Sequence, residues 1–101
     1  MTLSDLLGNH DAEYVQVDRC TPENTRTFPY QREPYVRASI PLKAGGTATV
    51  DGKAIRWCHA AVLVHWEEES GPVHNVWVAP ENLRRIGRDE SSWNDPYDIL
   101  D

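Results

Sequence analysis

The 101-residue sequence lacks long hydrophobic runs, and this absence excludes several classes of protein. Its longest apolar candidate, residues 60–66, has the length of one strand, whereas a membrane-spanning helix needs about 20 apolar residues. The first fourteen residues have neither the basic start nor the apolar core of a secretory signal peptide. We therefore expect a cytoplasmic protein that does not associate with membranes.

Cysteine is also scarce, and the two cysteines show no metal-binding spacing. Cys20 and Cys58 occur without a Cys-x-x-Cys or His-x-x-x-His motif, and in the cytoplasm we expect both to be reduced thiols. Neighbouring residues of a strand point to opposite faces, so Cys58 and His59 are poorly placed to share an ion. A thiol–imidazole pair of Cys58 and His74 is conceivable, but no oxyanion-forming turn accompanies it. The sequence predicts no enzyme, no metal and no cofactor.

Positive charge is limited, and the net charge is −6. Residues 1–50 carry six acids and five bases, whereas residues 51–101 carry ten acids and five bases. This balance counts against nucleic acid as a partner, because phosphate backbones require a basic surface. A nucleic-acid alternative would depend on the arginines, namely Arg26, Arg32, Arg37, Arg84, Arg85 and Arg88.

The remaining composition is that of one small globular domain, with 40% hydrophobic and 26% charged residues. We assign residues 1–88 to this domain and residues 89–101 to an acidic, aromatic tail. Leucines at helical spacing, a capping Thr or Ser and a following glycine predict a short helix over residues 1–9. The rest of the domain has the alternating pattern of strands.

Alternating apolar residues predict strands over residues 13–18, 35–42, 58–66 and 73–78. The segment 58–66 is apolar on both faces, which predicts a central strand covered on two sides. Prolines exclude a helix interior or a central strand from the intervening segment 19–34, which we interpret as a long loop.

The segment 47–57 predicts a β-hairpin of its own. Asp51 and Gly52 form the dipeptide preferred in two-residue turns, where both positions favour positive φ. The hairpin would pair Val50 with Lys53.

The stretch WVAPENLRRI, residues 77–86, predicts how the sheet ends. Pro80 stops a strand, residues 81–83 suit one 3₁₀ turn, and residues 84–86 resume as a short last strand. With the early proline-rich loop, this order resembles the end of an SH3-like barrel. The resemblance covers about residues 13–86 and implies a mainly β, partly open barrel of five to six strands. It does not imply a ligand, because members of this shape class bind different partners.

Aromatic residues in the loop and the tail are the best candidates for a protein-binding surface. We expect Tyr30 and Tyr35 to be exposed beside the proline-rich loop, and we add Trp93 and Tyr97 from the tail. The tail can either enter a groove of a partner or fold back onto its own barrel.

Together these features predict a non-catalytic protein-interaction module or small accessory protein whose partner is another protein. A structural or assembly subunit of a larger complex, including a viral particle or a homo-oligomer, is the first alternative. Nucleic-acid association through the arginines is the second.

Overall fold

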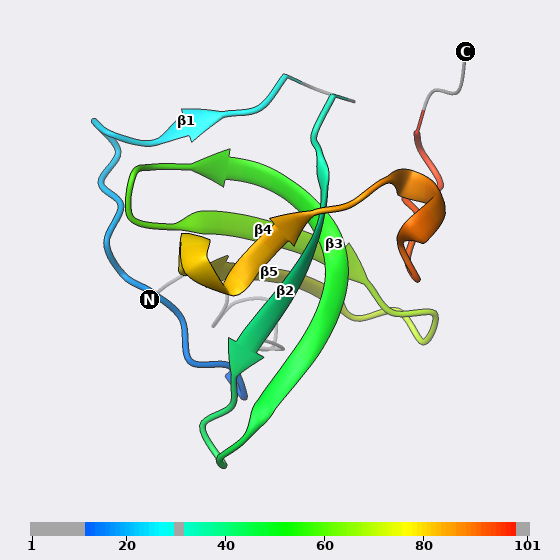
Figure 1. Cartoon of the computed structure of the whole chain (residues 1–101), viewed down its shortest axis with the longest axis horizontal. Coiled ribbons are helices and arrows are strands. Elements are labelled where there is room, and N and C mark those ends of the chain that lie inside the picture. Colours follow the sequence, from blue (N-terminus) through cyan, green and yellow to red (C-terminus); the bar gives the residue numbers. More distant parts are fainter. Residues whose placement is uncertain (1–11, 30–31, 99–101) are drawn as a thin grey trace.

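The computed structural model describes residues 12–29 and 32–98, and this part of the chain is mainly β (Figure 1). The predicted helix over residues 1–9 lies outside the described residues. Within the described ranges, no helix is long and apolar enough to cross a membrane. The elements are β1 Arg26–Thr27, β2 Tyr35–Pro41, β3 Thr47–Trp57, β4 Val62–Glu67, β5 Val73–Val78, the 3₁₀ turn η1 Pro80–Asn82, β6 Leu83–Arg85 and the 3₁₀ turn η2 Arg88–Glu90.

The strands form one antiparallel sheet in the order β5-β4-β3-β2-β6, and β1 pairs with the end of β3. This sheet does not close on itself, because β5 and β6 occupy its two ends. The predicted end of the sheet is confirmed: η1 follows β5, and β6 returns to pair with β2. The mainly β class and the strand count therefore agree with the sequence-based prediction.

The long strand β3 belongs to both halves of the sheet and curves between them (Figure 1). It pairs with β2 from Thr47 to Lys53, and with β4 from Lys53 to Trp57. The register with β4 shifts between Ala54 and Arg56, so Ile55 is an extra residue in β3. Such a bulge bends a strand and increases its twist.

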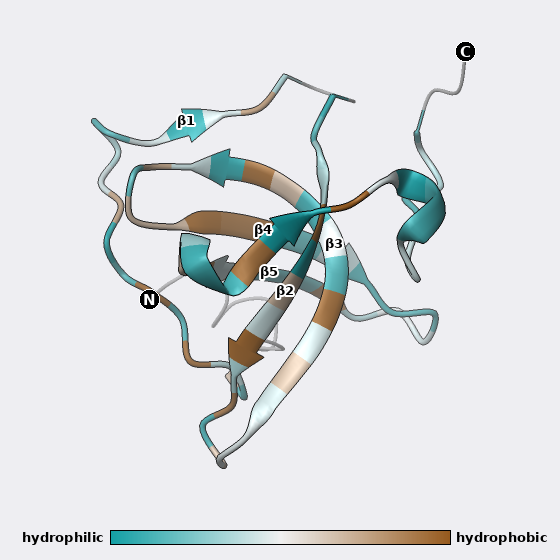
Figure 2. Cartoon of the chain, viewed as in Figure 1, coloured by the Kyte–Doolittle hydropathy of each residue, from teal (hydrophilic) through white to brown (hydrophobic). Residues whose placement is uncertain are grey.

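The core lies inside this curve. Ala54, Val64 and Val76 are opposite one another on β3, β4 and β5, and all three are almost fully buried. Ala38 and Ile40 of β2 add to the same cluster. Figure 2 shows hydrophobic segments on these strands and hydrophilic ones toward the C-terminal segment. The core is therefore built from alternate residues of neighbouring strands.

The hairpin predicted at Asp51-Gly52 is wrong. Both residues lie within β3, where they pair with Arg37 and Val36 of β2. The turn before β3 is at residues 42–46 instead, where Gly45 and Gly46 have φ angles of 104° and 80°. The glycine of the predicted hairpin is needed for a different reason: a Cβ on Gly52 would lie 2.5 Å from the carbonyl oxygen of His65. Gly52 thus permits a close approach of β4.

Two predicted strands are also shorter than expected. The segment 58–66 becomes β4 only from Val62, because the amide of Cys58 donates to the carbonyl of Ala61 and makes a turn. In the segment 13–18 only Tyr14 forms a bridge, to Leu42.

The segment 13–17 nevertheless links β2 to the end strand β5. The amide of Val15 donates to the carbonyl of Pro41 on β2, and the amide of Val17 donates to the carbonyl of Trp77 on β5. Tyr14, between them, packs its ring edge-on against Trp66 in the core. The gap that the open sheet leaves is thus partly bridged by backbone hydrogen bonds.

Replacing Gly52 by alanine will destabilise the protein by about 1–3 kcal/mol, because the new methyl group meets the rigid backbone of β4. Urea unfolding measures this loss. Gly87→Ala is the matched control: Gly87 has negative φ, and its new Cβ would meet only the movable carboxylates of Asp89 and Glu90. Equal stability of both variants would contradict the close approach.

Candidate functional site

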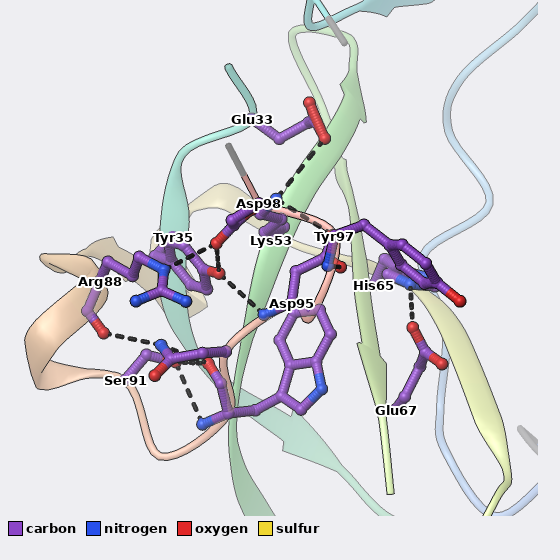
Figure 3. Close-up of polar contacts among 12 residues, drawn as sticks. Glu33, Tyr35, Lys53, His65, Glu67, Arg88, Ser91, Asp95, Tyr97 and Asp98 are labelled. Atoms are coloured by element: carbon purple, nitrogen blue, oxygen red, sulfur yellow. Dashed lines mark hydrogen bonds and ion pairs between the residues drawn. The ribbon is translucent and has the colours of Figure 1, made fainter. Parts of the chain in front are cut away.

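A buried lysine on β3 joins three segments of the chain (Figure 3). The side chain of Lys53 is only 3% exposed, and its ammonium group contacts Asp98, Asp95 at 3.1 Å and Glu33 at 3.8 Å. Glu33 precedes β2, whereas both aspartates belong to the segment after η2. A buried ammonium group is costly unless carboxylates compensate its charge, and here they come from residues distant in sequence.

The phenol of Tyr35 and the guanidinium of Arg88 complete this cluster (Figure 3). The Tyr35 hydroxyl donates to the carboxylate of Asp98 and accepts the backbone amide of Asp95 at 2.9 Å. Nε of Arg88 donates to the same carboxylate of Asp98 at 2.8 Å. Asp98 therefore accepts hydrogen bonds from three side chains of two strands and one turn.

These contacts shift several pKa values. Burial alone would raise the pKa of Asp98, but hydrogen bonds from Lys53, Tyr35 and Arg88 outweigh it and lower the pKa to about 2. Burial likewise disfavours the charged form of Lys53, yet its two aspartate partners raise its pKa above the usual value. The pKa of Tyr35 is raised by burial and by its bond to Asp98. At neutral pH, Lys53 is therefore a cation, Asp98 an anion and Tyr35 a neutral phenol.

A second ion pair holds the beginning of the same segment. Arg37 of β2 and Asp51 of β3 are opposite one another, and two guanidinium nitrogens donate to the two carboxylate oxygens at 2.7 and 3.1 Å. Asp51 also accepts the backbone amide of Ser92, and Arg37 donates to the carbonyl of Glu90. The hydrogen bond from Arg37 is the main reason that the pKa of Asp51 falls to about 2.

The two ion clusters fasten residues 88–98 onto β2 and β3. Trp93 lies between them, half-buried against the core, with its ring 6.2 Å from that of Tyr35 and 5.8 Å from that of His65. Up to Asp98, the tail therefore folds back onto its own sheet, as in one of the two arrangements considered from the sequence.

The four residues predicted to bind a partner, three tyrosines and one tryptophan, have different environments. Tyr35 is only 7% exposed, so its expected exposure is wrong: it lies on the face of β2 opposite the core, with Arg37, and the C-terminal segment covers it there and bonds to its hydroxyl. Tyr30 lies outside the described residues. Tyr97 is 74% exposed, whereas Trp93 of the same segment is half-buried. Among the described residues of this set, only Tyr97 is exposed.

The arginines of the nucleic-acid alternative do not all share a surface role. Arg37 and Arg88 are engaged in the two ion clusters. Arg84 is opposite Arg37 across β6 and β2, with Arg85 next to it, whereas Arg26 lies opposite Trp57 on the β1–β3 pair. Arg32 is exposed in the loop before β2. Ion pairing therefore removes two of the six charges from the proposed basic surface.

The expectation of reduced thiols is wrong, because Cys20 and Cys58 form a disulfide with their Cα atoms 5.8 Å apart. The turn after β3 places Cys58 against the loop that contains Cys20, a juxtaposition that spacing in the sequence does not indicate. A disulfide sulfur is neither a nucleophilic thiolate nor a zinc ligand. Among residues 12–29 and 32–98, no group of three or more His, Cys, Asp or Glu side chains could hold a metal ion.

The sequence-based analysis missed the central residues of the site, namely Lys53, Asp95, Asp98 and Glu33. The sequence does contain a signal for this cluster: the tail has acidic residues and no basic one, while Lys53 lies inside a strand-forming segment. The prediction of a hairpin turn next to Lys53 hid this signal.

Comparisons with known proteins identify no relative. No protein-family model matches the sequence. Neither the curated proteins nor the solved structures contain a match.

Lys53→Met will destabilise the protein by about 3–5 kcal/mol, because it leaves buried carboxylates without their cation. Urea unfolding measures the loss, and chymotrypsin will cleave faster after Trp93 or Tyr97 as the segment detaches. Lys43→Met, at an exposed lysine in the turn before β3, is the control and will change neither quantity. Unchanged stability and protease resistance in Lys53→Met would show that the cluster does not hold the segment.

Acid will destabilise the protein through Asp51 and Asp98. Both pKa values are about 2 in the folded protein, below the ordinary value of 3.8, so the folded state binds these protons less tightly than the unfolded chain. Their contribution, about 2 kcal/mol each, is complete above about pH 5 and disappears as the pH falls to about 2.

Unfolding free energies measured across this range test the effect of acid. Asp98→Asn will be less stable than the wild type at pH 7 and will lose less stability on acidification. Asp18→Asn, at an exposed loop position, will follow the wild-type curve. Parallel curves for Asp98→Asn and the wild type would refute the assignment.

Proposed function

We propose that this chain is a non-catalytic protein-interaction module, an SH3-like, partly open barrel whose fastened C-terminal segment presents Tyr97 to a partner protein. The strand order supports the barrel class. Strands β2 to β5 follow one another as antiparallel neighbours, and β6 returns after a 3₁₀ turn to pair with β2. The return of a short last strand after a 3₁₀ turn is what the resemblance to SH3-like barrels implies.

The observation that carries the proposal is the exposure of Tyr97 on a firmly held turn. Asp95 and Asp98, which flank it, are both bound to Lys53. In addition, the amide of Tyr97 donates to the side chain of Asp95 at 2.9 Å. An exposed tyrosine on such a support loses little conformational entropy when a partner covers it, which is why tyrosine is frequent at binding hot spots.

The surroundings of Tyr97 suit a small protein interface. Trp93 supplies a half-buried apolar surface in the same segment, and His65 packs edge-on against it. His65 and Glu67, 3.5 Å apart, supply polar groups on β4 (Figure 3). An aromatic centre with polar groups at its edge is the usual arrangement of a protein-binding patch.

The charged groups near this patch support a binding role rather than catalysis. A general base or nucleophile needs a pKa near neutrality, but the pKa of Lys53 is raised and that of Asp98 is lowered. Each of these shifts moves the pKa of the group further from neutral pH. The cluster therefore acts as a support for the segment that carries Tyr97.

Tyr97→Ala will weaken partner binding by at least about tenfold, as expected for loss of a hot-spot tyrosine. A photo-crosslinking residue placed at Asn94 first captures the partner in cells, and titration calorimetry with the purified partner then compares the variants. Val73→Ala, at another exposed apolar residue, is the control and will bind as the wild type does. Wild-type affinity of Tyr97→Ala, or no partner captured at this position, would refute the proposal.

A further inference from the structure

We propose a second binding site, for a small anion with a flat apolar body, between the loop at residues 20–25 and the outer face of β3 and β5. A depression of about 440 Å³ lies there, with Arg56 and Trp77 on the sheet side and Cys20, Thr21 and Thr25 on the loop side. Its volume is in the range of small-molecule sites. This site uses none of the residues assigned to protein binding, so it goes beyond the proposed function.

The bulge in β3 explains why a charged side chain enters this depression. Ala54 faces the core opposite Val64, and regular alternation would place residue 55 opposite residue 63. The extra residue instead places Arg56 opposite Leu63, whose partner on β5 is Trp77. Arg56, Leu63 and Trp77 consequently form a row across three neighbouring strands, and the guanidinium and the indole border the same depression.

The loop that forms the opposite wall is preformed. It is bonded to the turn after β3 by the disulfide between Cys20 and Cys58. Within the loop, the amide of Thr21 donates to the side chain of Asn24 at 2.8 Å, and the hydroxyl of Thr25 donates to the carbonyl of Thr21 at 2.6 Å. A wall held in this way does not have to be ordered when a ligand binds, which favours affinity.

The lining residues select the charge of the ligand. Arg56 is the one charged residue of the depression, and within the described part of the chain its side chain has no ion pair or hydrogen bond. A guanidinium group offers paired N–H donors that match a carboxylate or a phosphate. Among the lining residues that the structure describes there is no carboxylate, so none of them would attract a cation or repel an anion.

Two other groups select the shape of the ligand. The half-buried indole of Trp77 offers a flat apolar surface against which an aromatic ring can stack. Thr27, opposite Arg56 in the β1–β3 pair, adds a hydroxyl beside the guanidinium. Together these residues fit an aromatic carboxylate or an aryl phosphate, whose anionic group would bind Arg56 while its ring covers Trp77.

Benzoate and phenyl phosphate are suitable probes, with inorganic phosphate and benzyl alcohol as probes that lack the ring or the charge. In titrations of ¹⁵N-labelled protein, both aromatic anions will shift the indole N–H of Trp77 and the side-chain Nε–H of Arg56. They will bind at least about tenfold more tightly than either incomplete probe, because only they engage both groups.

Arg56→Gln will weaken benzoate binding by at least about tenfold, through loss of a charge-assisted hydrogen bond. Arg26→Gln is the matched control, at an exposed arginine of β1 that does not line the depression. Arg56 is itself exposed, so its variant will keep the wild-type spectrum elsewhere.

Three results would overturn the second site: no shift at Trp77 with either aromatic anion, equal loss of binding in the two arginine variants, or inorganic phosphate binding as tightly as phenyl phosphate. The last would reveal a general attraction of anions to the surface. None of these measurements involves Tyr97, so they test this site independently of the protein-binding proposal.

Discussion

The structure depends on compensating one buried positive charge. Lys53 lies on the strand shared by both halves of the sheet, and its ammonium group is removed from water. Such a charge requires several carboxylates at short distance, and Asp51, the carboxylate that β3 itself carries on that face, is paired with Arg37. Glu33, Asp95 and Asp98 meet this requirement, so one electrostatic need ties the segment before β2 and the segment after η2 to the middle of the sheet.

The same strand also determines where both proposed binding surfaces lie. Gly52 lets β4 approach closely, so β3 can curve from one half of the sheet to the other. The bulge just beyond it turns Arg56 outward, whereas Lys53, just before the bulge, lies under the C-terminal segment. The one-residue bulge in β3 thus lies between the buried charge of Lys53, which supports the structure, and the charge of Arg56, which is exposed to solvent.

Much of the fold class could be predicted from local pattern, whereas most of the candidate site could not. Asp51-Gly52 has the composition of a hairpin turn, but Arg37 pairs with Asp51 and the β4 backbone packs on Gly52, so tertiary contacts overrode the local preference. Tyr35 looked exposed beside a proline-rich loop, yet the C-terminal segment covers it on the face of β2 that lies opposite the core. Tyr97 and Trp93 remained as predicted contact residues, and Tyr30 lies outside the described residues.

By itself, the sequence determined the mainly β class, the strands at Tyr35–Pro41 and Val73–Val78 and the 3₁₀ turn at Pro80, because side-chain alternation and the missing proline amide act within a few residues. The tertiary structure decided which cations meet which carboxylates, which cysteines pair and where the acidic tail lies. The contacts involved join residues 38 and 63 positions apart, as in Cys20–Cys58 and Tyr35–Asp98. Only the curvature of the sheet brings such residues within bonding distance, and local periodicity contains no information about it.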